Sequence, residues 1–274
     1  MHATQEELDK RAQELLVQLE GKTLSAKERA QIPLQEMPTQ ASEVRVKNMQ
    51  EVALGYSDSQ VRVEAMRCLQ CKTKPCIAGC PVAIDIPAFI AQAAEGNYAK
   101  SVEIIKESSL LPSICGRVCP QESQCQLYCT VGKMFKDVDK SVSIGRIERF
   151  VADYAREHDL EKVPAIKAET GKKVAVVGTG PASISAAADL RREGHQVVMF
   201  EALHKAGGVL VYGIPEFRLP KKIVEHELNN LVEMGVEIKR NYLVGKTRKI
   251  SDLMDRDGFD AVFVGSGAGL PKFM

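Results

Sequence analysis

The sequence predicts a multidomain protein of the α and α/β classes. We expect an all-helical domain at residues 1–160, a linker at 161–171 and a Rossmann-like α/β domain at 172–274. Three observations predict this division. Capping motifs and apolar residues at helical spacing recur up to about residue 158, and β-branched strands alternate with helices from Lys172 onwards. All eight cysteines lie in the first part, between Cys68 and Cys129. A chain of 274 residues is long enough for two domains of usual size.

The composition is that of an ordinary globular protein. Hydrophobic residues make up 45% of the chain, charged residues 27%, and the net charge is +1. A surface that follows nucleic-acid phosphates would show a basic excess, so we expect no nucleic-acid partner. The N-terminus lacks the apolar core of a signal peptide, and the longest apolar runs are too short to cross a bilayer. We therefore expect a soluble cytoplasmic protein without membrane contact, whose clustered cysteines bind metals or redox groups.

Capping motifs place the helices of the first domain. Thr4 and Ser25 each open a capping box, and the apolar residues after Thr4 predict an amphipathic helix to about Gly21. The stretch 32–40 holds two prolines without periodicity, which is typical of either an extended arm lying over a surface or a simple connector. Further helices are expected from Ser57 to about Cys68 and over 86–94, 98–107 and 144–158.

The cysteines form two quartets, which are Cys68, Cys71, Cys76 and Cys80, and Cys115, Cys119, Cys125 and Cys129. Thiolates are soft ligands that suit iron–sulfur clusters, and short spacings let one loop wrap several corners of a cluster. In two-cluster ferredoxins the cysteine before proline binds the other cluster, so Cys80, which precedes Pro81, is expected to leave the first ligand set. The pattern predicts a ferredoxin-type domain with two [4Fe-4S] clusters. The second quartet consists of i, i+4 pairs, each on one face if those turns are helical.

Two closed zinc sites with four thiolates each are the alternative from the same residues. The Cys-Pro endings and the x3 spacings favour iron, because zinc ribbons use C-x2-C hooks separated by a longer loop.

From Lys172 the sequence predicts a strand at 172–178, a helix at 181–193 and a strand at 195–201. A glycine-broken hairpin (207–213), a helix (221–234), a strand (236–241), a short helix near Asp252 and a strand (261–265) are expected to follow. The first turn reads G-x-G-x-x-S, with Gly178 for the tight turn, Gly180 for close approach to a pyrophosphate and Ser183 in place of the third glycine. Glu201 ends the second strand and is placed to accept ribose hydroxyls. The motif predicts a dinucleotide without deciding between FAD and NAD(P).

Several long motifs occur in one order and carry a family resemblance: CLQCKTKPCIAGCPVAIDIPAFI, LPSICGRVCPQESQCQLYC, SIGRIERF, VAVVGTGPASISAAADL, EALHKAGGVLVYGIPEFRLPK and FVGSGAGLPKFM. Over about 49–274 the chain resembles the small (beta) chain of NADPH-dependent glutamate synthase. It is equally similar to the large subunit of NADH-dependent reduced ferredoxin:NADP oxidoreductase, and more distantly to the N-terminal part of dihydropyrimidine dehydrogenase.

The resemblance implies a helical domain with two [4Fe-4S] clusters and an FAD domain into which an NADPH domain is inserted. It places the ADP half of FAD at Gly178, Gly180, Pro181, Ala182 and Glu201. It places the isoalloxazine by Gly207, Gly208, Val209, Leu210 and Arg218, with Gly265 and Gly267 also near the flavin. The chain ends at Met274, where the family continues with a second dinucleotide fold. We therefore expect a truncated chain with an incomplete FAD-binding domain, weakened FAD binding, no NADPH site and an association-prone sheet edge at 261–265.

The resemblance also implies the ligand sets. One cluster is assigned to Cys68, Cys71, Cys76 and Cys129, and the other to Cys80, Cys119, Cys125 and Glu148, with Cys115 unligated. The alternative makes Cys115 the ligand and Glu148 a surface carboxylate, since oxygen suits this iron less well than a thiolate.

The implied function is electron transfer from NADPH through FAD and the clusters to a large flavin-containing catalytic subunit in a hetero-oligomer, most simply that of glutamate synthase, which makes glutamate from glutamine and 2-oxoglutarate. The alternatives are a subunit of an electron-bifurcating oxidoreductase or of dihydropyrimidine dehydrogenase, and, in another class, a non-enzymatic zinc-binding interaction module. We expect no catalytic nucleophile or general base, and His195 and His204 are interpreted as surface or cofactor-edge residues.

Overall fold

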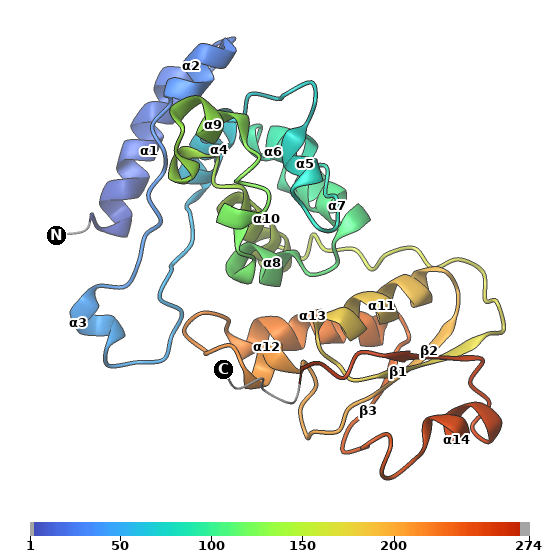
Figure 1. The fold of residues 1–274 in the computed structure, drawn as a ribbon. Helices are drawn as coiled ribbons and strands as arrows, with labels where there is room; N and C mark the ends of the chain where they lie inside the picture. Colours follow the sequence, from blue (N-terminus) through green and yellow to red (C-terminus); the bar gives the residue numbers. More distant parts are fainter. Residues whose placement is uncertain (1–2, 269–274) are drawn as a thin grey trace. The chain divides into compact units, whose positions relative to one another are not determined.

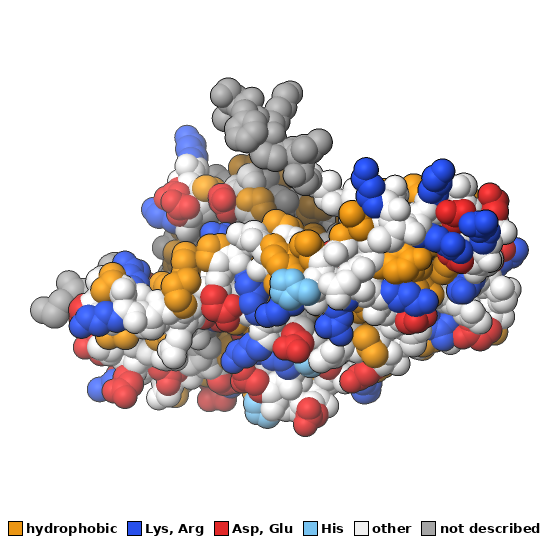
Figure 2. All heavy atoms as spheres, turned by 90° about the horizontal axis from the view of Figure 1, so that it is seen from below, with side chains coloured by type: hydrophobic (Ala, Val, Ile, Leu, Met, Phe, Trp, Pro, Cys, Tyr) orange, Lys and Arg blue, Asp and Glu red, His pale blue; other side chains and the backbone are white. Residues whose placement is uncertain are grey.

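The computed structural model describes residues 3–268, and the chain divides into two compact units, Met1–Glu161 and Lys162–Met274. Each unit is described by itself. Within the described range, no helix is long and apolar enough to cross a membrane. Figure 2 shows basic side chains interspersed with acidic ones on the face in view, as the net charge of +1 leads one to expect.

The regular elements of the first unit are helices (Figure 1). They are α1 (Gln5–Leu19), α2 (Ala26–Gln31), α3 (Ser42–Arg45), α4 (Asp58–Met66), α5 (Pro75–Ala78), α6 (Ile86–Ala94), α7 (Tyr98–Ser108), α8 (Pro112–Val118), η1 (Gln121–Ser123), α9 (Thr130–Phe135), η2 (Val138–Lys140) and α10 (Ile144–Glu157). The capping boxes predicted at Thr4 and Ser25 are confirmed, and Ser57 forms a third with Gln60. Thr39 and Ala53 form an isolated antiparallel bridge, the one departure from helical pairing among residues 3–161.

Residues 32–40 form an extended arm that lies over its own unit. Near its start the Gln35 backbone N–H donates to Glu64 at 2.9 Å, and the Tyr56 hydroxyl donates to the Gln35 carbonyl at 2.7 Å. Farther on, the Gln40 backbone N–H donates to the Val52 carbonyl at 2.9 Å and closes the loop that carries α3. Of the two interpretations of this stretch, the arm is the one that these contacts support.

The core of the first unit includes four of the cysteines. Large apolar side chains from α6, α7 and α10 are fully buried there, among them Phe89, Ile105 and Ile147. The same cluster of buried residues contains Cys68, Cys76, Cys125 and Cys129. The cysteine loops are therefore held by the packing of the core.

The second unit is a four-stranded parallel sheet with the order β3-β2-β1-β4. Its elements are β1 (Lys173–Val177), α11 (Pro181–Arg192), β2 (Gln196–Phe200), α12 (Val209–Tyr212), α13 (Lys221–Glu233), β3 (Glu237–Lys239), α14 (Ile250–Asp255) and β4 (Ala261–Val264). Leu253 of α14 packs with Ala175, Val198 and Phe200 on one face of the sheet, and Figure 1 shows α11 and α13 on the opposite face. This is the βαβ arrangement predicted from the alternating pattern.

The hairpin predicted at 207–213 is wrong, because residues Val209–Tyr212 form the short helix α12. The backbone N–H groups of Val211 and Tyr212 both donate to the Gly208 carbonyl. The strands of the described sheet are parallel and joined by helical crossovers, so a local hairpin would have no strand beside it to pair with. Leu210 alone of the four residues is buried, which is the pattern of a single helical turn packed on the unit.

The predicted sheet edge at 261–265 is confirmed. β4 stands at one end of the strand order, and Val264 is 55% exposed.

Candidate iron–sulfur and dinucleotide sites

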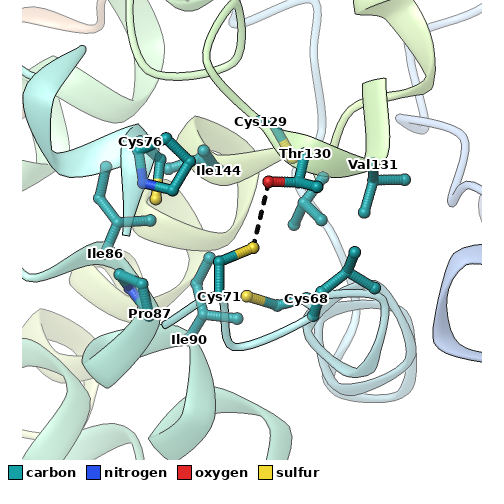
Figure 3. Close-up of a pocket in the computed structure, with 13 residues that line it drawn as sticks. Cys68, Cys71, Cys76, Ile86, Pro87, Ile90, Cys129, Thr130, Val131 and Ile144 are labelled. Atoms are coloured by element: carbon teal, nitrogen blue, oxygen red, sulfur yellow. Dashed lines mark hydrogen bonds between the residues drawn. The ribbon is translucent and has the colours of Figure 1, made fainter. Parts of the chain in front are cut away.

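Four cysteines from both quartets line one apolar pocket (Figure 3). Cys68 and Cys71 lie in the loop after α4, Cys76 lies in α5, and Cys129 immediately precedes α9. The pocket is closed by apolar side chains from α6 and α10, including Ile86, Ile90 and Ile144. The structure thus brings together Cys68, Cys71, Cys76 and Cys129, and places Cys80 elsewhere.

Two polar side chains that the sequence analysis did not single out contact these sulfurs. The Cys71 thiol donates to Thr130 Oγ1 at 3.2 Å, and Gln70 Nε2 lies 3.5 Å from Cys68 Sγ while donating to the Pro87 carbonyl at 3.0 Å. Both residues neighbour a cysteine in the sequence, and that position is the only signal that could have identified them. Their contacts fix how the thiols point into the pocket.

The pocket favours neutral thiols in the absence of a positive centre. Burial raises the pKa of Cys68 to about 11 and that of Cys76 to about 12, and the charges of neighbouring cysteines add to both shifts. A bound metal centre deprotonates such thiols, because the cation offsets the cost of a buried thiolate. The donor set therefore suits a soft, positively charged group.

A second group forms between α8, the turns after η1 and α10. Burial raises the pKa of Cys125 to about 12, and Glu148 and Cys80 contribute through their nearby charges. The interaction with Cys119, burial and the nearby charge of Glu148 raise the pKa of Cys115, whereas the interaction with Cys115 outweighs burial and lowers the pKa of Cys119 to about 7. The residues brought together here are Cys80, Cys115, Cys119, Cys125 and Glu148.

Only one of the two i, i+4 pairs lies on a helix. Cys115 is in α8 and Cys119 caps its C-terminus, with the Cys119 backbone N–H donating to the Cys115 carbonyl at 3.1 Å. Cys125 and Cys129 lie on turns between η1 and α9, so the helical arrangement considered for them is wrong. Cys125 and Cys129 are thereby free to belong to different groups.

Two glycines allow α10 to approach α8 and η1 closely. A Cβ at Gly116 would lie 2.6 Å from the Arg149 backbone nitrogen, and one at Gly145 would overlap the Gln121 side chain. The Gln121 amide in turn donates to the Cys115 carbonyl at 3.2 Å. This close approach brings Glu148, one residue before Arg149, to Cys115 and Cys119.

Glu148 is buried, with 6% of its surface exposed, and not a surface helix residue as the alternative interpretation required. Among the described residues, no hydrogen-bond partner reaches its Oε1 atom. Burial raises the pKa of Glu148 well above its usual value, and the charge of Cys119 adds to the shift. A buried acceptor without a partner costs about 1–3 kcal/mol, so this position suits a carboxylate that binds a group absent from the polypeptide.

The dinucleotide motif lies at the carboxyl ends of β1, β2 and β4. Gly178 has φ +95°, and a Cβ there would strike the Gly265 carbonyl oxygen, so only glycine fits. Gly180 caps α11, Pro181 and Ala182 form its first turn, and the space where a Gly180 Cβ would stand is open. Such a helix N-terminus offers unpaired N–H groups to an anion.

Ser183 takes over the packing role of the third glycine. It is fully buried, and its hydroxyl donates to the Gly265 carbonyl at 3.2 Å. The substitution is therefore tolerated, as a small residue was expected to be.

Glu201 is held at the end of β2 by Thr179, which the sequence analysis passed over. The Thr179 hydroxyl donates to Glu201 Oε2 and accepts from the Gly207 backbone N–H at 2.9 Å. The Leu203 backbone N–H donates to Glu201 Oε1 at 2.9 Å. The position of Thr179 between the two glycines of the motif was the available signal.

The residues that were expected to lie near the isoalloxazine ring differ in burial and position. Gly208 packs so tightly that a Cβ would lie 2.9 Å from Gly180 Cα, and Leu210 is buried. Val209 and Arg218 are exposed, and Gly267 has φ +74° in the last described stretch. The structure therefore gathers Gly207 and Gly208 with the first motif and leaves Arg218 on the surface.

Comparison with known proteins identifies both units. Residues 45–160 match the family described as dihydropyrimidine dehydrogenase domain II, 4Fe-4S cluster, and residues 176–234 match the NAD(P)-binding Rossmann-like domain. The chain is 36% identical to the glutamate synthase [NADPH] small chain of Escherichia coli K12, over 84% of this chain and 48% of that protein. It is 39% identical to the NAD-dependent dihydropyrimidine dehydrogenase subunit PreT of the same strain, over 77% of this chain and 50% of that protein. The small chain of Azospirillum brasilense is 34% identical, over 81% of this chain and 45% of that protein.

The chain belongs to the oxidoreductase family that includes the glutamate synthase small chain and the dihydropyrimidine dehydrogenase subunit PreT. It spans about half the length of the curated relatives it matches. The prediction of a 4Fe-4S domain joined to a dinucleotide-binding Rossmann domain is confirmed by the two family matches.

The residues present fit the cofactors of the family. Two groups of buried or partly buried thiols, and a buried carboxylate whose Oε1 has no partner among the residues that the structure describes, suit iron–sulfur clusters. Among residues 3–268, no three His, Cys, Asp or Glu side chains converge closely enough for a single metal ion. A [4Fe-4S] cluster distributes its ligands around a core of four irons.

Proposed function

We propose that this chain carries two [4Fe-4S] clusters and the ADP-binding part of an FAD site in an NAD(P)H-dependent electron-transfer subunit. The observation that carries the proposal is the pocket in which Cys129 of the second quartet joins Cys68, Cys71 and Cys76. When bound, the clusters supply one-electron carriers and FAD supplies the conversion between hydride and single electrons.

The polypeptide holds and orients these groups. Cys68, Cys71, Cys76 and Cys129 would hold one cluster, and Cys80, Cys119, Cys125 and Glu148 the other. Apolar side chains such as Ile86 and Ile144 exclude water from the first pocket, which protects the cluster and influences its potential.

The α/β unit contributes the binding site for the dinucleotide. The N-terminus of α11 at Gly180 faces open space and would receive the pyrophosphate of FAD. Glu201, held by Thr179 and Leu203, would accept the ribose hydroxyls. Electron transfer depends on such positioning of the cofactor.

The partner we propose is a large flavin-containing catalytic subunit of the glutamate synthase type, in a cytoplasmic hetero-oligomer. The similarity to the glutamate synthase small chain over 84% of this chain favours it. A dihydropyrimidine dehydrogenase complex is the second candidate, favoured by the 39% identity to PreT. Affinity purification of the tagged native protein, with identification of the subunit that co-purifies, separates the two.

Anaerobic purification followed by absorption spectroscopy and metal analysis tests the cofactor assignment. We expect broad absorbance near roughly 400 nm that dithionite bleaches, iron and sulfide in equal amounts, and FAD binding that Glu201→Ala weakens. A colourless protein that carries zinc in both cysteine groups would instead support the non-enzymatic interaction module.

A further inference from the structure

The second cysteine group contains one donor more than four iron sites need. If Cys80, Cys119, Cys125 and Glu148 are ligands, Cys115 is left over, although it lies among them and is partly buried. Glu148 is the fourth ligand in this assignment, because its carboxylate is buried and its Oε1 has no hydrogen-bond partner in the described part of the chain. Cys115 must then have another role or none.

The geometry around Cys115 is fixed on two sides. Cys115 lies one helical turn before Cys119, and the Cys119 backbone N–H is bonded to its carbonyl at 3.1 Å, which places the two side chains on the same face of α8. On its other side, Ser109 Oγ lies 3.9 Å from Cys115 Sγ, and Ser109 is buried. The three side chains form a chain from Ser109 through Cys115 to Cys119.

The close approach of α8 to α10 holds this chain against Glu148. Gly116 allows the Arg149 backbone nitrogen to come within 2.6 Å of where a Cβ would stand, and the Gln121 amide is bonded to the Cys115 carbonyl. These contacts hold the backbone of α8 that carries Cys115.

A thiol that is not a ligand is a hydrogen-bond donor. An S–H group is a weak donor toward neutral atoms, and a thiolate acceptor strengthens the bond because it is charged. Hydrogen bonds to cluster sulfurs help to set the reduction potential. Reduction adds negative charge to the cluster and its thiolates, so a donor stabilises the reduced form more than the oxidised form.

We propose that Cys115 is a positioning residue that tunes the second cluster by donating its S–H to the Cys119 thiolate, with the Ser109 hydroxyl donating in turn to Cys115 Sγ. This inference rests on the proposed function and its ligand sets. The hydrogen bond from Cys115 would give the second cluster a higher reduction potential than the same ligands would give without it.

The test compares wild type with Cys115→Ala, Cys115→Ser, Ser109→Ala and Glu148→Ala, all purified anaerobically. Iron content, the electron paramagnetic resonance spectrum of the reduced protein and the two midpoint potentials are measured. Glu148→Ala identifies the midpoint of the second cluster, since it alters that cluster's spectrum.

We expect Cys115→Ala to keep both clusters, to lower the second midpoint and to leave the first unchanged. Cys115→Ser keeps a hydrogen-bond donor, so its second midpoint potential should lie between those of wild type and Cys115→Ala. Ser109→Ala should lower the same midpoint potential by a smaller amount. Loss of a cluster in both Cys115 variants would make Cys115 a ligand, and an unchanged or raised midpoint would remove the tuning role. A wild-type protein without clusters would refute the proposed function itself.

Discussion

Glu64 and Arg67 form a buried ion pair whose disruption we expect to destabilise the helical unit strongly. The two side chains are 0% and 2% exposed, and the Arg67 Nη1 to Glu64 Oε1 distance is 2.6 Å. Glu64 also accepts the backbone N–H groups of Gln35 at 2.9 Å and Ser143 at 2.8 Å. Because these partners come from the arm and from the segment before α10, one carboxylate joins three parts of the chain.

The expected magnitude follows from this burial. Glu64→Gln leaves the Arg67 charge buried without its counter-charge, which costs about 3–5 kcal/mol. The Gln amide can accept one of the backbone N–H groups through its oxygen, but its own N–H₂ then faces the other donor. With a denaturant slope of about 2 kcal/mol per molar urea, the unfolding midpoint should fall by about 1.5–2.5 M.

Urea unfolding followed by circular dichroism at pH 7 measures the effect. The matched control is Glu103→Gln, because Lys100 and Glu103 form an ion pair of the same i, i+3 spacing on the surface, with side chains 48% and 58% exposed. Such exposed pairs contribute at most about 1 kcal/mol. If Glu64→Gln and the control shifted the midpoint equally, the argument from burial would be refuted.

Three further outcomes are expected. Burial raises the pKa of Asp153, but the hydrogen bond and charge of Arg117 outweigh it and hold the pKa below its usual value. Asp153→Asn should therefore cost about 1.5–3 kcal/mol at pH 7, and its deficit relative to wild type should shrink as the pH falls below about 4, as measured by urea unfolding across pH. Gly116→Ala places a methyl group against the backbone of α10 and should lower the stability by about 1–3 kcal/mol in thermal unfolding, whereas an unchanged Tm would contradict the close helix contact. Gly208→Ala, at φ +53° and against Gly180, should cost about 1–3 kcal/mol and weaken FAD binding in a fluorescence titration, and undiminished affinity would place the site elsewhere.

Local chemistry made much of the fold predictable. Capping boxes marked the starts of α1 and α2, because a side chain that bonds the N3 backbone N–H acts within four residues. The alternation of strands and helices after Lys172 predicted the parallel sheet, because the periodicity of apolar residues is also read from short stretches of sequence.

Contacts between distant residues were not predictable. Arg67 donates to the carbonyls of Ile32, Lys140 and Ser141. The spacing of these residues in the sequence does not predict these contacts. The β-branched residues of 207–213 suggested strands, but a parallel sheet with helical crossovers left them no partner, and they formed α12.

The candidate site likewise has features that the sequence predicted and features that it did not. The spacing of the cysteines and the Cys-Pro sequence predicted that the quartets exchange members, and Cys129 lines the pocket of Cys68, Cys71 and Cys76. Thr130 and Gln70 beside these sulfurs, and Thr179 beside Glu201, could not be selected, since their role depends on side-chain direction. Which donors bind iron stays a prediction.

The exchange of cysteines between the two clusters is tested most directly by electron paramagnetic resonance of the reduced single variants Cys76→Ala, Cys80→Ala, Cys125→Ala and Cys129→Ala. We expect Cys76→Ala and Cys129→Ala to lose or alter the same cluster signal, and Cys80→Ala and Cys125→Ala to alter the other. If Cys76→Ala and Cys80→Ala instead affected one signal, and Cys125→Ala and Cys129→Ala the second, each quartet would hold its own cluster and the crossed assignment would be wrong.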